Sequence, residues 1–307
     1  MLPNGQIADD TTALVETLEA VRPILERNPD AGIACAMKNS GLGVGVPDVG
    51  RCRIFVSDGK AHLHSSAACI GQGMGTVQVQ YVHEITGLPL AQIVYCAPDT
   101  ALAPDSGNTT ASRQTLFTGE ATVRAARLLK EALDAANGDL LALNGQEFYG
   151  VYTGATDPIG SDKEHPVSHI AYGYATHVVE LDDDGRVARV TAAHDVGRAV
   201  NPVALTGQIE GGVVMSLGYA LTEDFPLENG KPLKKFGTLG LFKAPQTPEI
   251  TAVTLGKVPK DGLACGAKGV GEICSIPTAP AVQLAYYNRD KKFRTRLPLA
   301  DTAYSKK

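Results

Sequence analysis

Apolar residues that recur at helical spacing predict five helices along the chain. These helices span residues 11–25, 76–86, 113–136, 203–221 and 279–287. Runs of β-forming residues predict strands, including one hairpin around the turn Asp58-Gly59 and a second around the acidic turn 182–185. The predicted strands span residues 51–56, 60–67, 92–96, 171–181, 186–193 and 250–255. Because helices and strands are interleaved, we predict an α+β architecture with mixed sheets, in two lobes formed by residues 1–140 and 141–307.

The composition excludes two classes of partner. The chain has 307 residues, 44% of them hydrophobic, which is enough for a sizeable core. A net charge of -5 does not provide the basic surface that nucleic acid or an anionic membrane would require. No apolar run approaches the roughly 20 residues that span a bilayer, and the N-terminus lacks the pattern of a signal peptide. We therefore expect a cytoplasmic protein.

Six cysteines occur singly, without the spacing of an iron–sulfur or zinc site. We expect them to be buried and reduced, so any iron–sulfur cluster must be bound by another chain. The histidines also lack metal-site spacing, and the acidic run 182–184 is interpreted as a solvated hairpin tip. No side chain of this protein is expected to ligate a metal.

A glycine-rich loop, residues 71–76, lies between a predicted strand and a predicted helix. Free N–H groups at such a position can hold a phosphate oxygen, although a tight turn explains the glycines equally well. A dinucleotide-binding fold would need an acidic residue at the end of a second strand, and Asp99 is not suitably placed. Gln72 offers an acceptor and two donors, which suit the edge of a heterocycle.

A second polar segment, residues 105–114, crowds hydroxyls and amides at the start of a helix. Capping needs only one of them, so the segment is either a second anion-binding loop or an ordinary polar loop.

Glycines also interrupt the predicted helix at residues 207–212, where each costs roughly 0.5–1 kcal/mol relative to alanine. Close approach to a cofactor and close helix packing both explain them.

Glu272 follows a flexible loop and precedes the apolar segment 273–277. Semi-buried surroundings favour the protonated form of a carboxylate and prepare it for proton transfer near neutral pH. Glu272 is therefore a candidate general base. The alternative is a surface glutamate, or one that forms a salt bridge with Lys268.

In this order, the motifs resemble the second molybdopterin-binding half of the xanthine dehydrogenase and aldehyde oxidase family. The resemblance spans nearly the whole chain. It rests on Gly-Gln-Gly at 71–73, Thr-Thr-Ala-Ser at 109–112, Asp-Val-Gly-Arg with Asn-Pro at 195–202, Gly-Gln-Ile-Glu-Gly at 207–211 and Gly-Val-Gly-Glu at 269–272. Each motif is weak alone, but the ordered set is specific.

The resemblance implies a molybdenum–molybdopterin cofactor, which bacterial members of the family commonly carry as the cytosine dinucleotide. It assigns contacts with the pterin and its phosphate to Gly71, Gln72, Gly73 and Thr76. It assigns the dinucleotide side to Thr109, Thr110, Ala111 and Ser112, and further cofactor contacts to Gln208, Lys268, Gly269, Val270 and Gly271. Glu272 matches the family's active-site base, which acts in the hydroxylation of a purine- or nicotinate-like N-heterocycle or of an aldehyde.

The departures from the family define the expected partners. The Gly-Gly-Phe-Gly-Gly and Phe-Arg-Gly-Phe-Gly loops of the first molybdopterin half do not occur in the sequence. Iron–sulfur motifs and a flavin domain are missing as well, so we expect separate chains that carry the first half, [2Fe-2S] clusters and FAD. A subunit of a split enzyme fits best, and a truncated gene product is the alternative. A non-catalytic scaffold or assembly module that keeps the fold is the second functional hypothesis.

Overall fold

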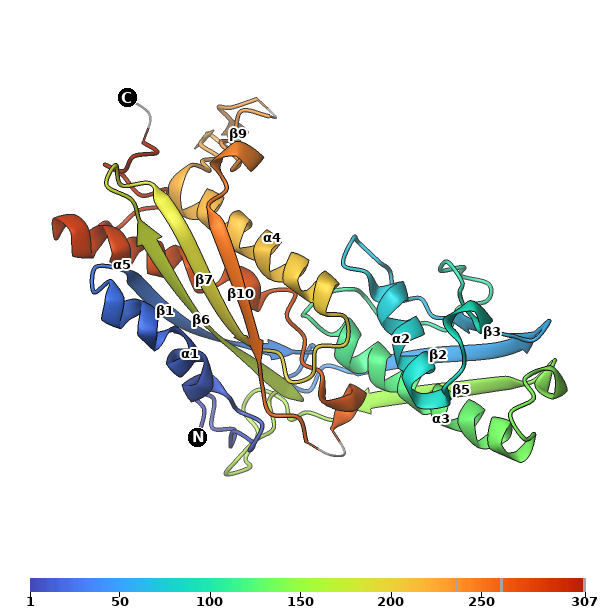
Figure 1. The fold of residues 1–307 in the computed structure, drawn as a ribbon. Helices are drawn as coiled ribbons and strands as arrows, with labels where there is room; N and C mark the ends of the chain where they lie inside the picture. Colours follow the sequence, from blue (N-terminus) through green and yellow to red (C-terminus); the bar gives the residue numbers. More distant parts are fainter. Residues whose placement is uncertain (236, 260–261, 306–307) are drawn as a thin grey trace.

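Two four-stranded sheets lie end to end and give the molecule two lobes (Figure 1). The computed structural model describes residues 1–307 except 236, 260–261 and 306–307, and no candidate site residue falls in these gaps. Sheet A contains β1 (Gly32–Ser40), β6 (Ala171–Leu181), β7 (Val187–Asp195) and β10 (Glu249–Leu255), in that order. Sheet B contains β4 (Ile93–Tyr95), β3 (Lys60–His64), β2 (Asp48–Ser57) and β5 (Glu147–Gly154). The predicted α+β class is confirmed.

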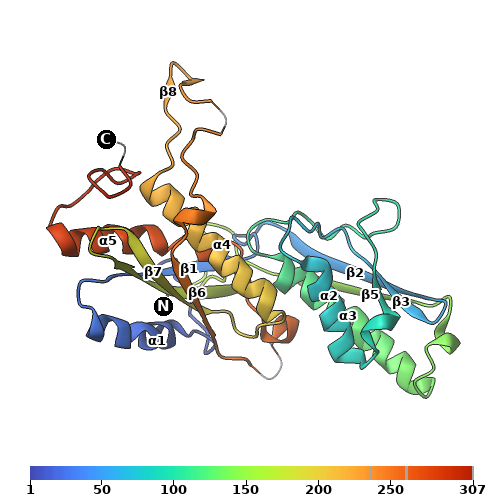
Figure 2. The ribbon, with the colours of Figure 1, turned by 45° about the horizontal axis from the view of Figure 1, so that its top comes forward.

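Helices cover both faces of sheet A. Strands β1, β6 and β7 are antiparallel neighbours, and β10 runs parallel to β7. On one face, α1 (Leu14–Arg27) packs through Val21 against Val178 and Ala193. On the other face, α4 (Pro202–Leu221) and α5 (Thr278–Asp290) close the main core over Val179 and Val190. The short hairpin of β8 (Leu227–Glu228) and β9 (Lys231–Pro232) protrudes beyond the end of α4 (Figure 2).

One face of sheet B is covered by α2 (Met74–Thr86) and α3 (Gln114–Ala135) (Figure 2). The strict alternation of β2 turns Ile54 and Val56 inward, toward Leu129 of α3. Strand β5 lies directly against α3, because a Cβ on Gly150 would be 1.9 Å from the carbonyl oxygen of Ala121. Hydrophobic burial on one face therefore holds this lobe together.

The expected boundary near residue 140 does not coincide with the division between the sheets. The chain starts in sheet A, crosses to sheet B for residues 48–154 and then returns to sheet A. A cut at residue 140 would separate β5 from β2, with which it pairs from Asp48↔Gly154 to Phe55↔Glu147. The sequence prediction missed both β1 and β5, whose partners lie far away along the chain, so the boundary was misplaced.

The local predictions are confirmed more closely. The five predicted helices form as α1 to α5, and both predicted hairpins form as β2–β3 and β6–β7. No helix in the described part of the chain has the length and apolar character needed to cross a membrane.

The expectation of uniformly buried cysteines is wrong: Cys52 and Cys274 are buried, but Cys35 and Cys69 are exposed. All six thiols are free.

The glycines inside α4 have two different environments. A Cβ on Gly212 would lie 2.4 Å from the Cβ of Cys274, so close packing accounts for this glycine. At Gly207 and Gly211 a Cβ would meet nothing within 4 Å. Close helix packing therefore explains Gly212. Gly207 and Gly211 instead leave an open strip on the helix beside Gln208, which is where close approach to a cofactor would need glycine.

Adjacent alanine substitutions in α4 should shift stability in opposite directions. Gly212→Ala should lower the free energy of unfolding by about 1–3 kcal/mol, because the new methyl group overlaps Cys274. Gly211→Ala should raise it by about 0.5–1 kcal/mol, because alanine favours the helix and the methyl group enters open space. Urea denaturation of the two variants measures both effects, and equal shifts would contradict the packing described for Gly212.

Two fully buried histidines link neighbouring strands of sheet A. The Nε2 atoms of His177 and His194 are 2.8 Å apart, and the Nδ1 atom of His177 lies 2.8 Å from the hydroxyl of Thr278. Burial lowers the pKa of His177 well below its usual value and lowers the pKa of His194 to about 4. Both rings are therefore neutral at neutral pH.

This pair predicts a loss of stability in mild acid. Histidines of the unfolded chain bind protons below about pH 6.5, whereas the buried pair resists protonation. The contribution of the pair to the free energy of unfolding is therefore fully present above that pH. It is lost as the pH drops toward 4, the folded-state pKa of His194. We expect the free energy of unfolding in urea to decrease by about 2–3 kcal/mol between roughly pH 7.5 and 5.5. The matched variant His177→Gln should lose about half of this dependence, and an unchanged slope would contradict the assignment.

Candidate cofactor site

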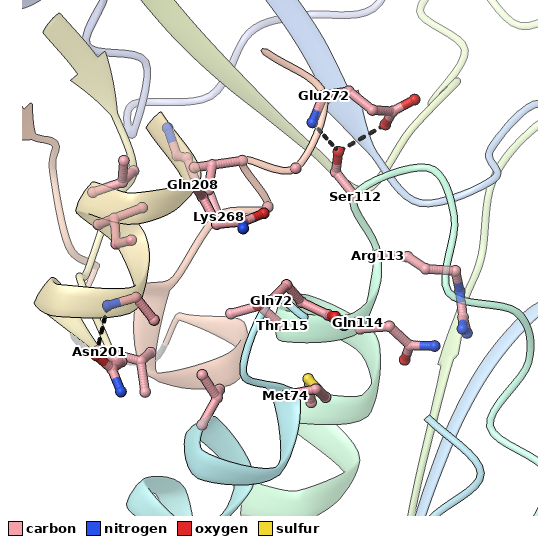
Figure 3. A pocket seen from close by; sticks show the side chains of 18 of the residues that line it. Gln72, Met74, Ser112, Arg113, Gln114, Thr115, Asn201, Gln208, Lys268 and Glu272 are labelled. Atoms are coloured by element: carbon pink, nitrogen blue, oxygen red, sulfur yellow. Dashed lines mark hydrogen bonds between the residues drawn. The ribbon is translucent and has the colours of Figure 1, made fainter. Parts of the chain in front are cut away.

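A cavity of about 310 Å³ lies where the two lobes meet, at the ends of α2, α3 and α4 (Figure 3). Loops that are far apart in the sequence form its walls. Most of the predicted site residues line it, namely Gln72, Thr109, Thr110, Ala111, Ser112, Gln208, Lys268, Gly269, Val270, Gly271 and Glu272. Gly71, Gly73 and Thr76 are not among the lining residues. The structure thus brings together motifs that the sequence could only place in order.

The two glycines of the first loop shape the backbone around Gln72. Gly71 has φ +111° and Gly73 has φ +83°, conformations that an L side chain rarely adopts. Between them, the Gln72 amide is held by its own loop: Oε1 accepts from the N–H of Ile70 at 2.6 Å, and Nε2 donates to the carbonyl of Ala68 at 3.2 Å. Gln72 reaches the cavity from a fixed position.

The start of α2 favours negative charge. The sulfur of Cys69 accepts a hydrogen bond from the N–H of Gly73 at 3.3 Å. Partial desolvation raises the pKa of this thiol, but hydrogen bonds from the backbone N–H groups of residues 71 and 73–75 outweigh it and leave the pKa below its ordinary value. The loop therefore behaves as a helix N-terminus that stabilises an anion.

Arg113 organises the second loop from inside. Its guanidinium is 1% exposed and donates from Nε to Oδ1 of Asp48 at 2.6 Å. It also donates to the carbonyls of Ser106 and Asn108. Much of the polar character of residues 105–114 thus supports the loop's own fold, which answers part of the question that the sequence left open. The backbone N–H groups of Ala111 and Ser112 form no hydrogen bond within the described residues.

A third loop packs directly against the second. A Cβ on Gly269 would lie 1.8 Å from the carbonyl oxygen of Ser112, so this contact requires glycine. The N–H of Gly269 donates to Oγ of Ser40 at the end of β1, over 3.1 Å. The N–H groups of Val270 and Gly271 have no hydrogen-bond partner in the part of the chain that the structure describes.

Glu272 sits at the cavity edge with its carboxylate partly exposed. Its side chain is 44% exposed, and Oε2 accepts from the Ser112 hydroxyl at 2.7 Å. The same oxygen lies 3.0 Å from Nζ of Lys38. The backbone N–H of Glu272 donates to Ser112 at 3.1 Å, so the hydroxyl bridges backbone and side chain (Figure 3). Glu272 is ion-paired, as one alternative expected, but to Lys38 instead of Lys268.

Comparison with known proteins identifies the fold around this cavity. A family model described as "Molybdopterin cofactor-binding domain" matches residues 26–153 and 141–250, which together exceed half of the chain. The chain belongs to this molybdopterin-binding family. A solved aldehyde oxidoreductase from Desulfovibrio gigas superposes with a TM-score of 0.78 at 26% identity, over 94% of this chain and 34% of that chain.

Two curated relatives extend the comparison. The gamma subunit of the 6-hydroxypseudooxynicotine dehydrogenase complex of Paenarthrobacter nicotinovorans is 28% identical, over 84% of this chain and 37% of the relative. A xanthine dehydrogenase molybdenum-binding subunit of Escherichia coli is 28% identical, over 83% of this chain and 38% of the relative. The chain therefore spans about two fifths of the length of these relatives.

The cavity suits a molybdopterin group by the chemistry of its lining. Pterin carbonyls and phosphate oxygens need donors, and the unpartnered N–H groups of residues 111–112 and 270–271 supply them. The side-chain amide of Gln208 also lines the cavity and makes no hydrogen bond to the described chain. No cluster of three or more histidine, cysteine or acidic side chains suited to a metal occurs among the described residues. The molybdopterin family thus matches the donor set.

Lys268 lines the cavity and also takes part in a buried ion pair. Its ammonium lies 2.6 Å from Oδ2 of Asp195, and the two side chains are 6% and 0% exposed. It also donates to the carbonyl of Thr11 at 2.9 Å. Lys268 therefore lines the cavity while its ammonium is held in a buried ion pair, and its contact with the cofactor stays a prediction.

The sequence prediction also missed two residues that build the site. Lys38 lies in β1, a strand that was not predicted, although residues 33–37 form the short continuous apolar run that a buried strand can show. Asp195 was noted in the sequence only as the first residue of the Asp-Val-Gly-Arg motif, without its ion pair to Lys268. Neither residue could be linked to its partner from the sequence alone, because Glu272 and Lys268 lie far along the chain from Lys38 and Asp195 and outside the strands of sheet A.

Lys268→Met should destabilise the molecule strongly. The substitution leaves the Asp195 carboxylate buried without its counter-charge, which costs about 3–5 kcal/mol. The matched control Lys257→Met removes an exposed pair with Glu16 and should change stability by less than about 1 kcal/mol. Urea unfolding of both variants measures the difference. Similar effects would show that Lys268 is not structural.

Proposed function

We propose that this chain forms one wall of the cofactor site of a molybdenum hydroxylase and supplies its general base, Glu272. The observation that carries the proposal is the position of the Glu272 carboxylate, at the edge of a cavity lined by unpartnered donors. The relatives named above are subunits of dehydrogenases and an oxidoreductase, which supports a redox enzyme. The chain acts together with further polypeptide, because it matches only about two fifths of those relatives.

The chain's own groups would hold the cofactor by hydrogen bonds. Backbone N–H groups of residues 111–112 and 270–271 would donate to phosphate and pterin oxygens, and the amides of Gln72 and Gln208 would contact the ring system. When bound, the cofactor, proposed here in its cytosine dinucleotide form, would supply a two-electron oxidant for hydroxylation with oxygen from water. FAD and [2Fe-2S] clusters on partner chains would then receive the electrons.

Glu272 would accept the proton that the water-derived nucleophile loses. A carboxylate can do this when it lies within hydrogen-bonding reach of the nucleophile, and such a base contributes on the order of 10²–10⁴ in rate. The substrate would be an N-heterocycle or an aldehyde. This choice is supported by the relatives, which include a xanthine dehydrogenase, a 6-hydroxypseudooxynicotine dehydrogenase and an aldehyde oxidoreductase.

Glu272→Gln and Gln208→Ala should fail in different ways in the assembled complex. Glutamine keeps the shape of Glu272 and its contact with Ser112 but cannot accept the proton, so kcat should fall on the order of 10²–10⁴ at unchanged molybdenum content. Gln208→Ala should instead lower molybdenum content, because it removes a cofactor contact. Steady-state kinetics and metal analysis on the same preparations separate the two effects.

Near-normal activity of fully loaded Glu272→Gln would exclude this residue as the base. An inactive, molybdenum-free complex that contains the wild-type chain would favour the scaffold hypothesis instead.

A further inference from the structure

Two donors converge on one oxygen of the Glu272 carboxylate. The Ser112 hydroxyl is 2.7 Å from Oε2, and the Lys38 ammonium is 3.0 Å from the same atom. Oε1 accepts no hydrogen bond from any residue that the structure describes. One oxygen thus anchors the side chain, while the other is free to take up a proton.

Lys38 is itself held in place. Its ammonium donates to the carbonyl oxygen of Asn39 at 3.2 Å and to the side-chain oxygen of Asn39 at 3.1 Å. The Asn39 amide donates in turn to the carbonyl of Gly41 at 3.0 Å. The Lys38 side chain is only 23% exposed. Its position is therefore fixed by the end of β1, unlike that of a lysine free in solvent.

Lys38, and not the nearby His169, supplies the positive charge beside the Glu272 carboxylate. The neighbouring titratable group is His169, whose pKa is lowered by burial and by the charge of Lys38. His169 is thus neutral at neutral pH. The ammonium faces Glu272 without a competing acid, since the other groups it contacts are the neutral oxygens of Asn39.

Ser112 is equally constrained. It adopts φ +51° next to Ala111 at φ +49°, a left-handed pair that non-glycine residues rarely adopt. The carbonyl of Ala111 accepts from the N–H of Gly41 at 2.9 Å, and Gly269 packs on Ser112. The segment that carries Lys38 and the loop that carries Ser112 are therefore joined next to Glu272.

We propose that Lys38 is a positioning residue that, together with Ser112, fixes the Glu272 carboxylate through Oε2 and leaves Oε1 for proton transfer. This inference rests on the proposed function, because it takes Glu272 to be the base. The ion pair is partly exposed, at 23% for Lys38 and 44% for Glu272, and such pairs contribute little to stability, so the role of Lys38 is expected in catalysis rather than in folding.

The contact itself can be tested on the full chain without any activity. A water-soluble carbodiimide condenses adjacent amine and carboxyl groups to an amide, with loss of water to the reagent. We expect an amide between Lys38 and Glu272 in the peptide mass spectrum, because the two groups are 3.0 Å apart. Lys38→Arg should abolish this product. Cross-linking of Lys38 to other carboxyls, but never to Glu272, would overturn the proposal.

The catalytic consequence can be tested in the assembled complex. Lys38→Met should lower kcat on the order of 10-fold at nearly unchanged KM and molybdenum content, because Glu272 loses its orientation. Lys38→Arg should restore most of the rate, because arginine keeps the charge and the donors.

Lys130→Met is the matched control, since Lys130 forms an exposed pair with Asp134 on α3, outside the residues that line the cavity. This variant should behave as the wild type. If Glu272→Gln is inactive but Lys38→Met matches the wild type in kcat, the positioning role alone is wrong. If Glu272→Gln remains active, the proposed function fails first.

Discussion

The candidate site depends on the close approach of two loop backbones at Gly269 and Ser112. A Cβ on Gly269 would lie 1.8 Å from the Ser112 carbonyl oxygen, so any side chain would force the loops apart. This contact holds the Ser112 hydroxyl within reach of both the backbone and the carboxylate of Glu272. Ser112 itself adopts a left-handed conformation, which costs about 1–3 kcal/mol and persists only where the surrounding structure holds it.

A buried ion pair lies beside this contact on each side. Arg113, which follows Ser112, is paired with Asp48, and Lys268, which precedes Gly269, is paired with Asp195. Burying such charges costs several kcal/mol unless further hydrogen bonds compensate, and both pairs have them. A buried, hydrogen-bonded ion pair therefore flanks each loop, one in each lobe. Such rigid support is what a site requires if it is to hold a base within a fraction of an ångström.

The sequence predicted the elements that local patterns define. The helical periods and the two hairpin turns were sufficient for the helices and the hairpins. The ordered motifs, through the family resemblance that they carry, pointed to most of the residues that line the cavity. The missing parts are those set by contacts between distant segments. Strands β1 and β5 acquire their role only through pairing with β6 and β2, and Lys38 meets Glu272 from the end of β1, far away along the chain. The buried pair of Lys268 with Asp195 was missed for the same reason, since the two residues lie 73 positions apart along the chain.

Metal and pterin analysis of the chain purified from its native host, with all copurifying chains retained, addresses whether this fold still holds a molybdopterin. The donor-lined cavity and the family assignment predict molybdenum and pterin in near-equimolar amounts with the chain. An intact assembly that contains neither would contradict the account and would leave the chain as a scaffold that has kept the fold without the cofactor.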